Sequence, residues 1–182
     1  YAVYDAAGNE LTNLTVTDGE INSSTTVKLT LTTGNTYSVI FWAAAEGAPY
    51  KVNFADKTMT VNYEGAVSND EARDAFYKYH TFTVNGAQTE TIELKRPFAQ
   101  LNIGTSDYDE AKKAGYVPTS SSVTVKNLKN TLNFFDGTVS GNEEARVFAS
   151  AAIPADQEFP VADCEYIAMN YLLVGADKET VE

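Results

Sequence analysis

The alternation of apolar and polar residues changes phase inside one stretch near the middle of the chain, residues 90–104 (ETIELKRPFAQLNIG). The apolar residues that alternate with polar ones there are Ile92, Leu94, Ala99, Leu101 and Ile103. They fall on even positions before Pro97 and on odd positions after it. A strand whose side-chain period slips by one residue needs a bulge or a bend, and proline favours one. The pattern predicts one long strand, kinked at Pro97, that leaves one layer of a β structure and joins another.

The rest of the chain consists mostly of shorter stretches of the same kind, separated by turn residues such as Gly34-Asn35, Asn85-Gly86 and Asp136-Gly137. Period-two alternation between turn signals is typical of β-strands. The predicted strands cover residues 1–5, 14–17, 27–31, 36–45, 50–54, 59–63, 79–84, 122–139, 147–154 and 157–175. Residues 50–63 are expected to form a hairpin, and residues 122–139 slip in phase near Lys126-Asn127. Residues 36–45 are apolar on both faces, which predicts a central strand, and residues 140–146 are predicted to be a polar loop.

Two segments carry helix signals. Residues 71–79 follow Ser68-Asn69 and begin with acidic residues, and residues 107–115 follow Thr105-Ser106 and end at Gly115. Polar caps, early acids and a terminal glycine favour short helices. Many short strands with helices only as connectors predict an all-β protein, a β-sandwich of Greek-key type with one or two short helices. At 182 residues, we expect one sandwich domain over residues 1–182, trimmed at both ends from a longer precursor.

Charge narrows the range of partners. The chain has 13 basic and 25 acidic side chains, a net charge of −12, which repels phosphate backbones and anionic lipid headgroups. Nucleic acid is therefore a poor candidate partner. No stretch is long and apolar enough to form a transmembrane segment.

The sequence offers no catalytic constellation. His80 is the only histidine, so neither a histidine triad nor a zinc site with two imidazoles can be built, and we expect it to bond to backbone or water. The acidic cluster at residues 107–110 has Ala111 and Lys112 where a calcium loop needs a ligand and a glycine. Cys164 is predicted to be an inert core residue. We therefore predict no catalytic, cofactor-binding or metal site, no cofactor and no enzyme activity.

Aromatic residues keep a second possibility open. Exposed aromatic platforms are typical of glycan-binding modules. Trp42 lies in an all-apolar segment and is expected in the core, whereas Tyr50, Tyr63 and Tyr116 lie near turns and are expected to be exposed. A hydrolase with two carboxylates paired in space is a third alternative, which sequence spacing cannot test. The glycosylation-type motifs at Asn13 and Asn22 indicate only surface loops.

Three segments together resemble the fimbrillin-like surface proteins of Bacteroidetes, which include the subunits of type V pili. They are the opening YAVYD with the later GNTYSVIFWA, the stretch ELKRPFAQLNIGT around Pro97, and the late strand YIAMNYLLV. Their order and spacing cover nearly the whole chain.

The resemblance implies a transthyretin-like β-sandwich in a secreted lipoprotein, held in the outer membrane by a lipidated cysteine upstream of this chain. In polymerising members, a protease removes the segment before the first strand, and a strand from a neighbouring subunit fills the groove left behind. Such β-strand addition uses main-chain hydrogen bonds for affinity and side-chain pockets for specificity.

The expected function is therefore that of a cell-surface structural and adhesion protein, a pilus or fimbria subunit or a related surface lipoprotein. Its expected partners are other pilin or surface subunits, joined by strand addition, and host or microbial surface ligands. The alternative is a surface glycan-binding module of a gut-type bacterium, which binds sugars through exposed aromatic side chains.

Overall fold

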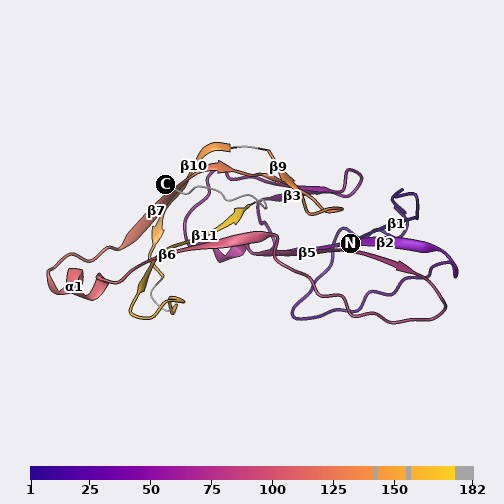
Figure 1. The fold of residues 1–182 in the computed structure, drawn as a ribbon, viewed down its shortest axis with the longest axis horizontal. Coiled ribbons are helices and arrows are strands. Elements are labelled where there is room, and N and C mark those ends of the chain that lie inside the picture. Colours follow the sequence, from indigo (N-terminus) through magenta and orange to yellow (C-terminus); the bar gives the residue numbers. More distant parts are fainter. Residues whose placement is uncertain (142, 155–156, 175–182) are drawn as a thin grey trace.

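The computed structural model describes residues 1–141, 143–154 and 157–174, and its regular secondary structure is mostly β-strand (Figure 1). The fold is an all-β, sandwich-like arrangement of antiparallel sheets, as the alternation predicts. The strands are β1 (Ala2–Tyr4), β2 (Thr36–Ala44), β3 (Tyr50–Asn53), β4 (Thr58–Val61), β5 (Ala75–Thr83), β6 (Phe98–Thr105), β7 (Ser120–Leu128), β8 (Thr131–Asn133), β9 (Val139–Ser140), β10 (Glu143–Ala152) and β11 (Glu165–Leu173). The helices are a 3-10 turn, η1 (Glu71–Arg73), and one α-helix, α1 (Tyr108–Lys113).

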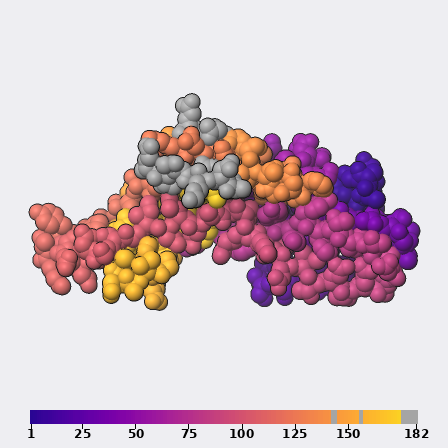
Figure 2. All heavy atoms as spheres, in the orientation of Figure 1, coloured from indigo at the N-terminus to yellow at the C-terminus, as the bar shows by residue number. Residues whose placement is uncertain are grey.

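The strands form four sheets, with the orders β1-β2-β5, β3-β4-β8-β9, β6-β11 and β7-β10. All of the pairings between these strands are antiparallel. The sheet β1-β2-β5 lies at one end of the elongated molecule, and α1 lies at the other end (Figure 1). Figure 2 shows the same ends, with the indigo and purple early residues at one end and the residues around α1 at the other.

One core runs through most of the molecule. At one end, the first face of β1-β2-β5 contributes Ala2, Tyr4 and Ile40, and the sheet β3-β4-β8-β9 contributes Met59 and Leu132. The Tyr4 hydroxyl donates a 2.7 Å hydrogen bond to the Phe54 carbonyl, which joins the two sheets. The core continues through the other two sheets, where its buried members include Val125, Phe148, Ala168, Met169 and Leu173. Apolar burial on this scale is the main stabilising contribution to the fold.

The second face of β1-β2-β5 carries a separate apolar cluster of Val3, Tyr37, Val39 and Val84. Leu11, Leu14, Leu29, Leu31, Phe41 and Phe82 pack against it. No described strand covers this face: its cover comes from the loops at residues 11–35 and 84–95.

The stretch around Pro97 changes sheets, but it does not form one continuous strand. After Pro97, β6 pairs with β11, and before it, the chain touches β5 only at Lys95, which exchanges hydrogen bonds of 2.9 and 3.0 Å with Tyr77. Residues 84–94 lie over the second face of β1-β2-β5 instead of continuing along the edge of β5, so no ladder forms there. Ile92 and Leu94 are still less exposed than their neighbours, so the predicted alternation survives in burial although the strand does not.

The helix predicted over residues 71–79 is wrong beyond its first turn. Asp70 caps η1 by accepting a 3.1 Å hydrogen bond from the Ala72 amide, but β5 begins at Ala75. Pairing of β5 with β2 over nine residues overrides the local helix signal, because helices this short gain little without tertiary packing.

Four smaller expectations also fail. Residues 14–17 and 27–31 form no strand, although Val27, Leu29 and Leu31 are partly buried between exposed neighbours as the alternation predicts. Asn85-Gly86 does not close a two-residue hairpin, since the segment after it pairs with β5 only at Lys95. The loop predicted over residues 140–146 gives way at Glu143 to β10.

Other expectations are confirmed. β2 is central in its sheet, and the hairpin of β3 and β4 forms. Helix α1 ends before Gly115, whose φ of 86° is the left-handed conformation that favours glycine there. The predicted slip in β7 falls at Asn127, with φ of 58°, so that burial passes from Val125 to Leu128.

We predict that Phe148→Ala lowers the free energy of unfolding by about 3–5 kcal/mol, because a fully buried aromatic leaves a cavity. Phe148 is 0% exposed and packs edge-on against Tyr63 at 5.9 Å. The matched control is Val147→Ala on the same strand, where the side chain is 59% exposed and the change should stay within about 0.5 kcal/mol. Denaturant unfolding measures both, and equal losses would contradict the assignment of the core.

Candidate functional site

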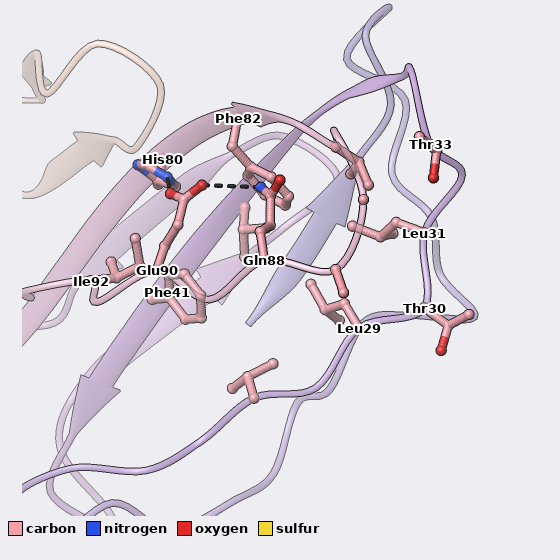
Figure 3. Close-up of a pocket in the computed structure, with 15 residues that line it drawn as sticks. Leu29, Thr30, Leu31, Thr33, Phe41, His80, Phe82, Gln88, Glu90 and Ile92 are labelled. Carbon is pink, nitrogen blue, oxygen red and sulfur yellow. Dashed lines mark hydrogen bonds and ion pairs between the residues drawn. The ribbon is translucent and has the colours of Figure 1, made fainter.

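One hollow lies on the second face of β1-β2-β5, and we call it the outer groove (Figure 3). Its volume is about 490 Å³. Its apolar lining comes from the sheet and from the two covering loops and consists of Val27, Leu29, Leu31, Val39, Phe41, Phe82, Val84 and Ile92. The size and the mostly apolar lining are typical of binding sites.

The walls of the outer groove are two extended segments, residues 27–31 and 86–94. Their main chains make no hydrogen bond to any described residue. Extended backbone beside an apolar hollow offers both hydrogen-bonding groups and a surface for side chains. The groove therefore has the two features that an added strand requires.

A chain of polar contacts fixes the 86–94 wall to β5 (Figure 3). His80 Nε2 and Glu90 Oε2 are 2.6 Å apart, and Gln88 Nε2 donates to Glu90 Oε1 at 3.1 Å. The Gln88 side-chain oxygen accepts from the Asn85 amide at 3.2 Å. The His80 ring lies almost parallel to Phe82, at 13° and 5.8 Å. The expectation that His80 bonds to backbone or water is thus wrong, because its partner is the Glu90 carboxylate.

The edge of β5 beside this groove is open. Tyr77 uses its outward N–H and C=O on Lys95, and groups two residues apart on a strand point the same way. Tyr79, Thr81 and Thr83 therefore direct their amides outward, away from β2. These outward amides have no backbone partner among the described residues. β5 carries Lys78, but residues 79–83 contain no Lys, Arg, Asp, Glu or Pro, so this part of the edge is a template for another strand.

A second hollow of about 440 Å³ lies on the first face of the same sheet, between β5 and the loop that joins β8 to β9. We call it the hairpin cleft, and its lining includes Tyr77, Tyr79, Lys95, Phe134, Phe135 and Asp136. Phe135 is 60% exposed and stands edge-on to Tyr79 at 5.2 Å.

The electrostatics of the hairpin cleft follow from two short-range effects. Thr138 donates to Asp136 Oδ1 through its hydroxyl at 2.7 Å and its amide at 2.9 Å, which lowers the pKa of Asp136. Burial, and then the charge of Asp136, raise the pKa of Tyr77. The cleft therefore presents a carboxylate and a neutral phenol beside the basic side chains of Lys78, Lys95 and Arg96.

The aromatic residues considered from sequence separate into three groups. Trp42 packs partly buried in the core, against Tyr50 and Phe134 at 5.3 and 5.7 Å, as expected. Tyr63 is 2% exposed, so its predicted exposure is wrong: its hydroxyl accepts a 3.0 Å hydrogen bond from the Leu173 amide in the core. Tyr50 is half-buried against Trp42 and Phe98, so its predicted exposure is wrong as well. Tyr116 is 76% exposed as predicted, beyond α1 and outside both hollows.

The other candidates stay apart from the hollows. Cys164 is only partly buried, so the prediction of a core thiol is wrong: it precedes β11 and does not share the burial of that strand. Asp107 is the N-terminal cap position of α1, and Asp109 and Glu110 lie in its first turn. Within residues 1–141, 143–154 and 157–174, no group of three His, Cys, Asp or Glu side chains is placed to hold a metal. No helix in that part of the chain is long and apolar enough to cross a membrane.

Sequence reasoning missed Glu90, Lys95 and Phe135 as lining residues. The sequence pattern predicts that Glu90 and Lys95 are charged residues on the solvent-facing side of a strand. Phe135 is one of two consecutive phenylalanines, and only the position of the β8–β9 turn decides that Phe134 is 1% exposed and Phe135 is not buried.

The fold is that of a β-sandwich-like protein with hollows on both faces of one three-stranded sheet. The chain belongs to a family of unknown function (DUF6562), whose model matches residues 1–182. No curated protein and no solved structure matches the chain.

We predict that the outer groove binds the fluorescent dye anilinonaphthalene sulfonate in the folded protein. Phe82→Glu should remove most of the fluorescence enhancement, because it puts a charge among apolar lining residues. Phe135→Glu, on the opposite face of the sheet, is the matched control and should retain it. Equal loss in both variants would place the dye elsewhere and contradict the accessibility of the groove.

Proposed function

We propose that the protein is a cell-surface structural and adhesion protein, a fimbrillin-like pilus subunit or related surface lipoprotein that assembles by β-strand addition. The observation that carries the proposal is the outer groove, an uncovered apolar hollow beside an unpaired edge of β5. The resemblance of residues 1–5, 34–43, 93–105 and 166–174 to fimbrillin-like proteins agrees with it in the kind of partner expected.

In this proposal, a strand from another subunit lies along Tyr79, Thr81 and Thr83 and exchanges main-chain hydrogen bonds with them. Its side chains alternate between the two faces of the sheet. Those on the second face enter the outer groove beside Phe82, where apolar burial adds to the main-chain bonds.

Localisation and partners follow from the same proposal. The protein sits on the outer membrane or in a fimbrium through a lipid anchor, and its partners are other pilin or surface subunits. Because strand addition depends on backbone bonds and apolar contacts rather than on charge pairs, assembly should change little with salt. No nucleic acid is expected to bind a chain with a net charge of −12.

The test compares gel mobility with and without boiling. Cells producing the protein with all of its native sequence are fractionated, and the protein is run on a denaturing gel. We expect a ladder of multimers that survives detergent at room temperature and collapses to monomer on boiling, because exchanged strands release only on unfolding.

Phe82→Glu should abolish the ladder, since an unpaired charge would have to be buried in the groove. Phe135→Glu is the control and should preserve it, because Phe135 lies on the other face and is 60% exposed. Circular dichroism confirms that both variants fold. A single monomer band from the unmodified protein, both with and without boiling, would contradict the proposal.

A further inference from the structure

We propose that the hairpin cleft is a binding site for a neutral pyranose sugar, on the opposite face of the sheet from the outer groove. It lies on the first face of β1-β2-β5. Side chains alternate between the faces along β5, so Tyr77 and Tyr79 line the cleft, whereas His80 and Phe82 line the outer groove on the other face. A volume of about 440 Å³ lies in the range of small-molecule sites.

The first argument is the aromatic platform. Phe135 is 60% exposed at the rim of a hollow, although its neighbour Phe134 is 1% exposed. Phe135 is also held in place, because its amide donates to Asn133 Oδ1 at 2.9 Å and its ring contacts Tyr79. A fixed, solvent-facing ring beside a cleft suits stacking against the apolar C–H face of a sugar.

The second argument is the set of polar groups around that ring. Asp136 has Oδ1 engaged by Thr138, and Oδ2 has no hydrogen bond to a described residue. The Lys95 ammonium and the Tyr77 hydroxyl likewise have no partner within the described part of the chain. Lys95 is directly opposite Tyr77 in their bridge, so both side chains lie on the face that carries the cleft.

These groups match the chemistry of sugar hydroxyls. A hydroxyl both donates and accepts, so one sugar can donate to the Asp136 carboxylate and accept from Lys95 and Tyr77. The net charge of −12 repels anionic sugars at long range, and the Asp136 carboxylate repels them inside the cleft. Lys78, Lys95 and Arg96 also line the cleft, and Arg96 is paired with Asp74, so the comparison of neutral with anionic glycans is the decisive part of the test. Ring stacking with a carboxylate and an ammonium at its edge distinguishes this site from the largely apolar outer groove.

The glycine of the turn keeps the cleft open. Gly137 has φ of 73°, and a Cβ built there would lie 3.1 Å from the Tyr77 hydroxyl. A side chain at this position would strain the turn and crowd the hydroxyl that is to meet the sugar.

The test is a glycan array carrying neutral hexosides and N-acetylhexosaminides together with sialylated and sulfated sugars. The best-retained neutral sugar is then titrated by calorimetry. We expect retention of neutral glycans, with Phe135→Ala and Asp136→Asn each weakening binding about tenfold. Lys95→Gln should weaken it less, because an amide still donates.

Two controls separate this proposal from general surface effects and from strand addition. Tyr116→Ala removes an aromatic ring of even greater exposure outside the cleft and should leave sugar affinity unchanged. Phe82→Glu, which blocks the outer groove, should also leave it unchanged. Sugar binding by an unmodified protein that forms no ladder of multimers would therefore count against the proposed function alone.

Three outcomes would overturn the sugar site: no retention of any neutral glycan, retention only of anionic glycans, or retention that all of the cleft variants keep. Circular dichroism and unchanged unfolding midpoints exclude misfolding as the cause of lost binding. Phe135 and Asp136 lie in an exposed turn, so both variants are expected to fold.

Discussion

Apolar residues on both faces of β2 impose the constraint on which the rest of the structure depends. Ile40 on one face is 0% exposed within the main core, and Val39 on the other is 2% exposed within a separate cluster. A strand of this kind must be covered on both sides. The first side is covered by the sheet β3-β4-β8-β9, whereas the second is covered only by loops. The outer groove is the part of that second side which the loops leave open.

The loop at residues 84–94 connects this constraint to the two hollows. By folding over the second face, it provides Ile92 as apolar cover and is fixed there by the contact of Glu90 with His80. Among the described residues, the same excursion leaves the outer edge of β5 without a backbone partner from Tyr79 to Thr83. The chain returns to β5 at Lys95, which lines the hairpin cleft on the opposite face. One irregular segment thus shapes an apolar groove, an open edge and a polar cleft.

The fold was predictable from sequence where local pattern and tertiary pairing agree. Alternation and turn residues located β2, the β3–β4 hairpin and the slip at Asn127, because each depends on neighbours close in the chain. The predictions of a helix at residues 71–79 and of strands at residues 27–31 and 90–96 were wrong. Whether these segments form strands depends on their pairing partners, and the local pattern of residues does not show which segments pair. The two hollows could not be predicted for the same reason. Phe135 differs from Phe134 only in the side of a turn on which it falls, and the His80–Glu90 contact depends on where a loop settles.

The measurement that tests the account most directly is hydrogen exchange at the backbone amides of Tyr79, Thr81 and Thr83, in the isolated chain and in the assembled protein. The account predicts fast exchange in the isolated chain, since these outward groups lack backbone partners, and strong protection after assembly, when another strand pairs with them. The inward amides of Lys78, His80 and Phe82, which pair with β2, serve as internal references and should be protected in both states. Fast exchange at Tyr79, Thr81 and Thr83 in both states would contradict strand addition at this edge.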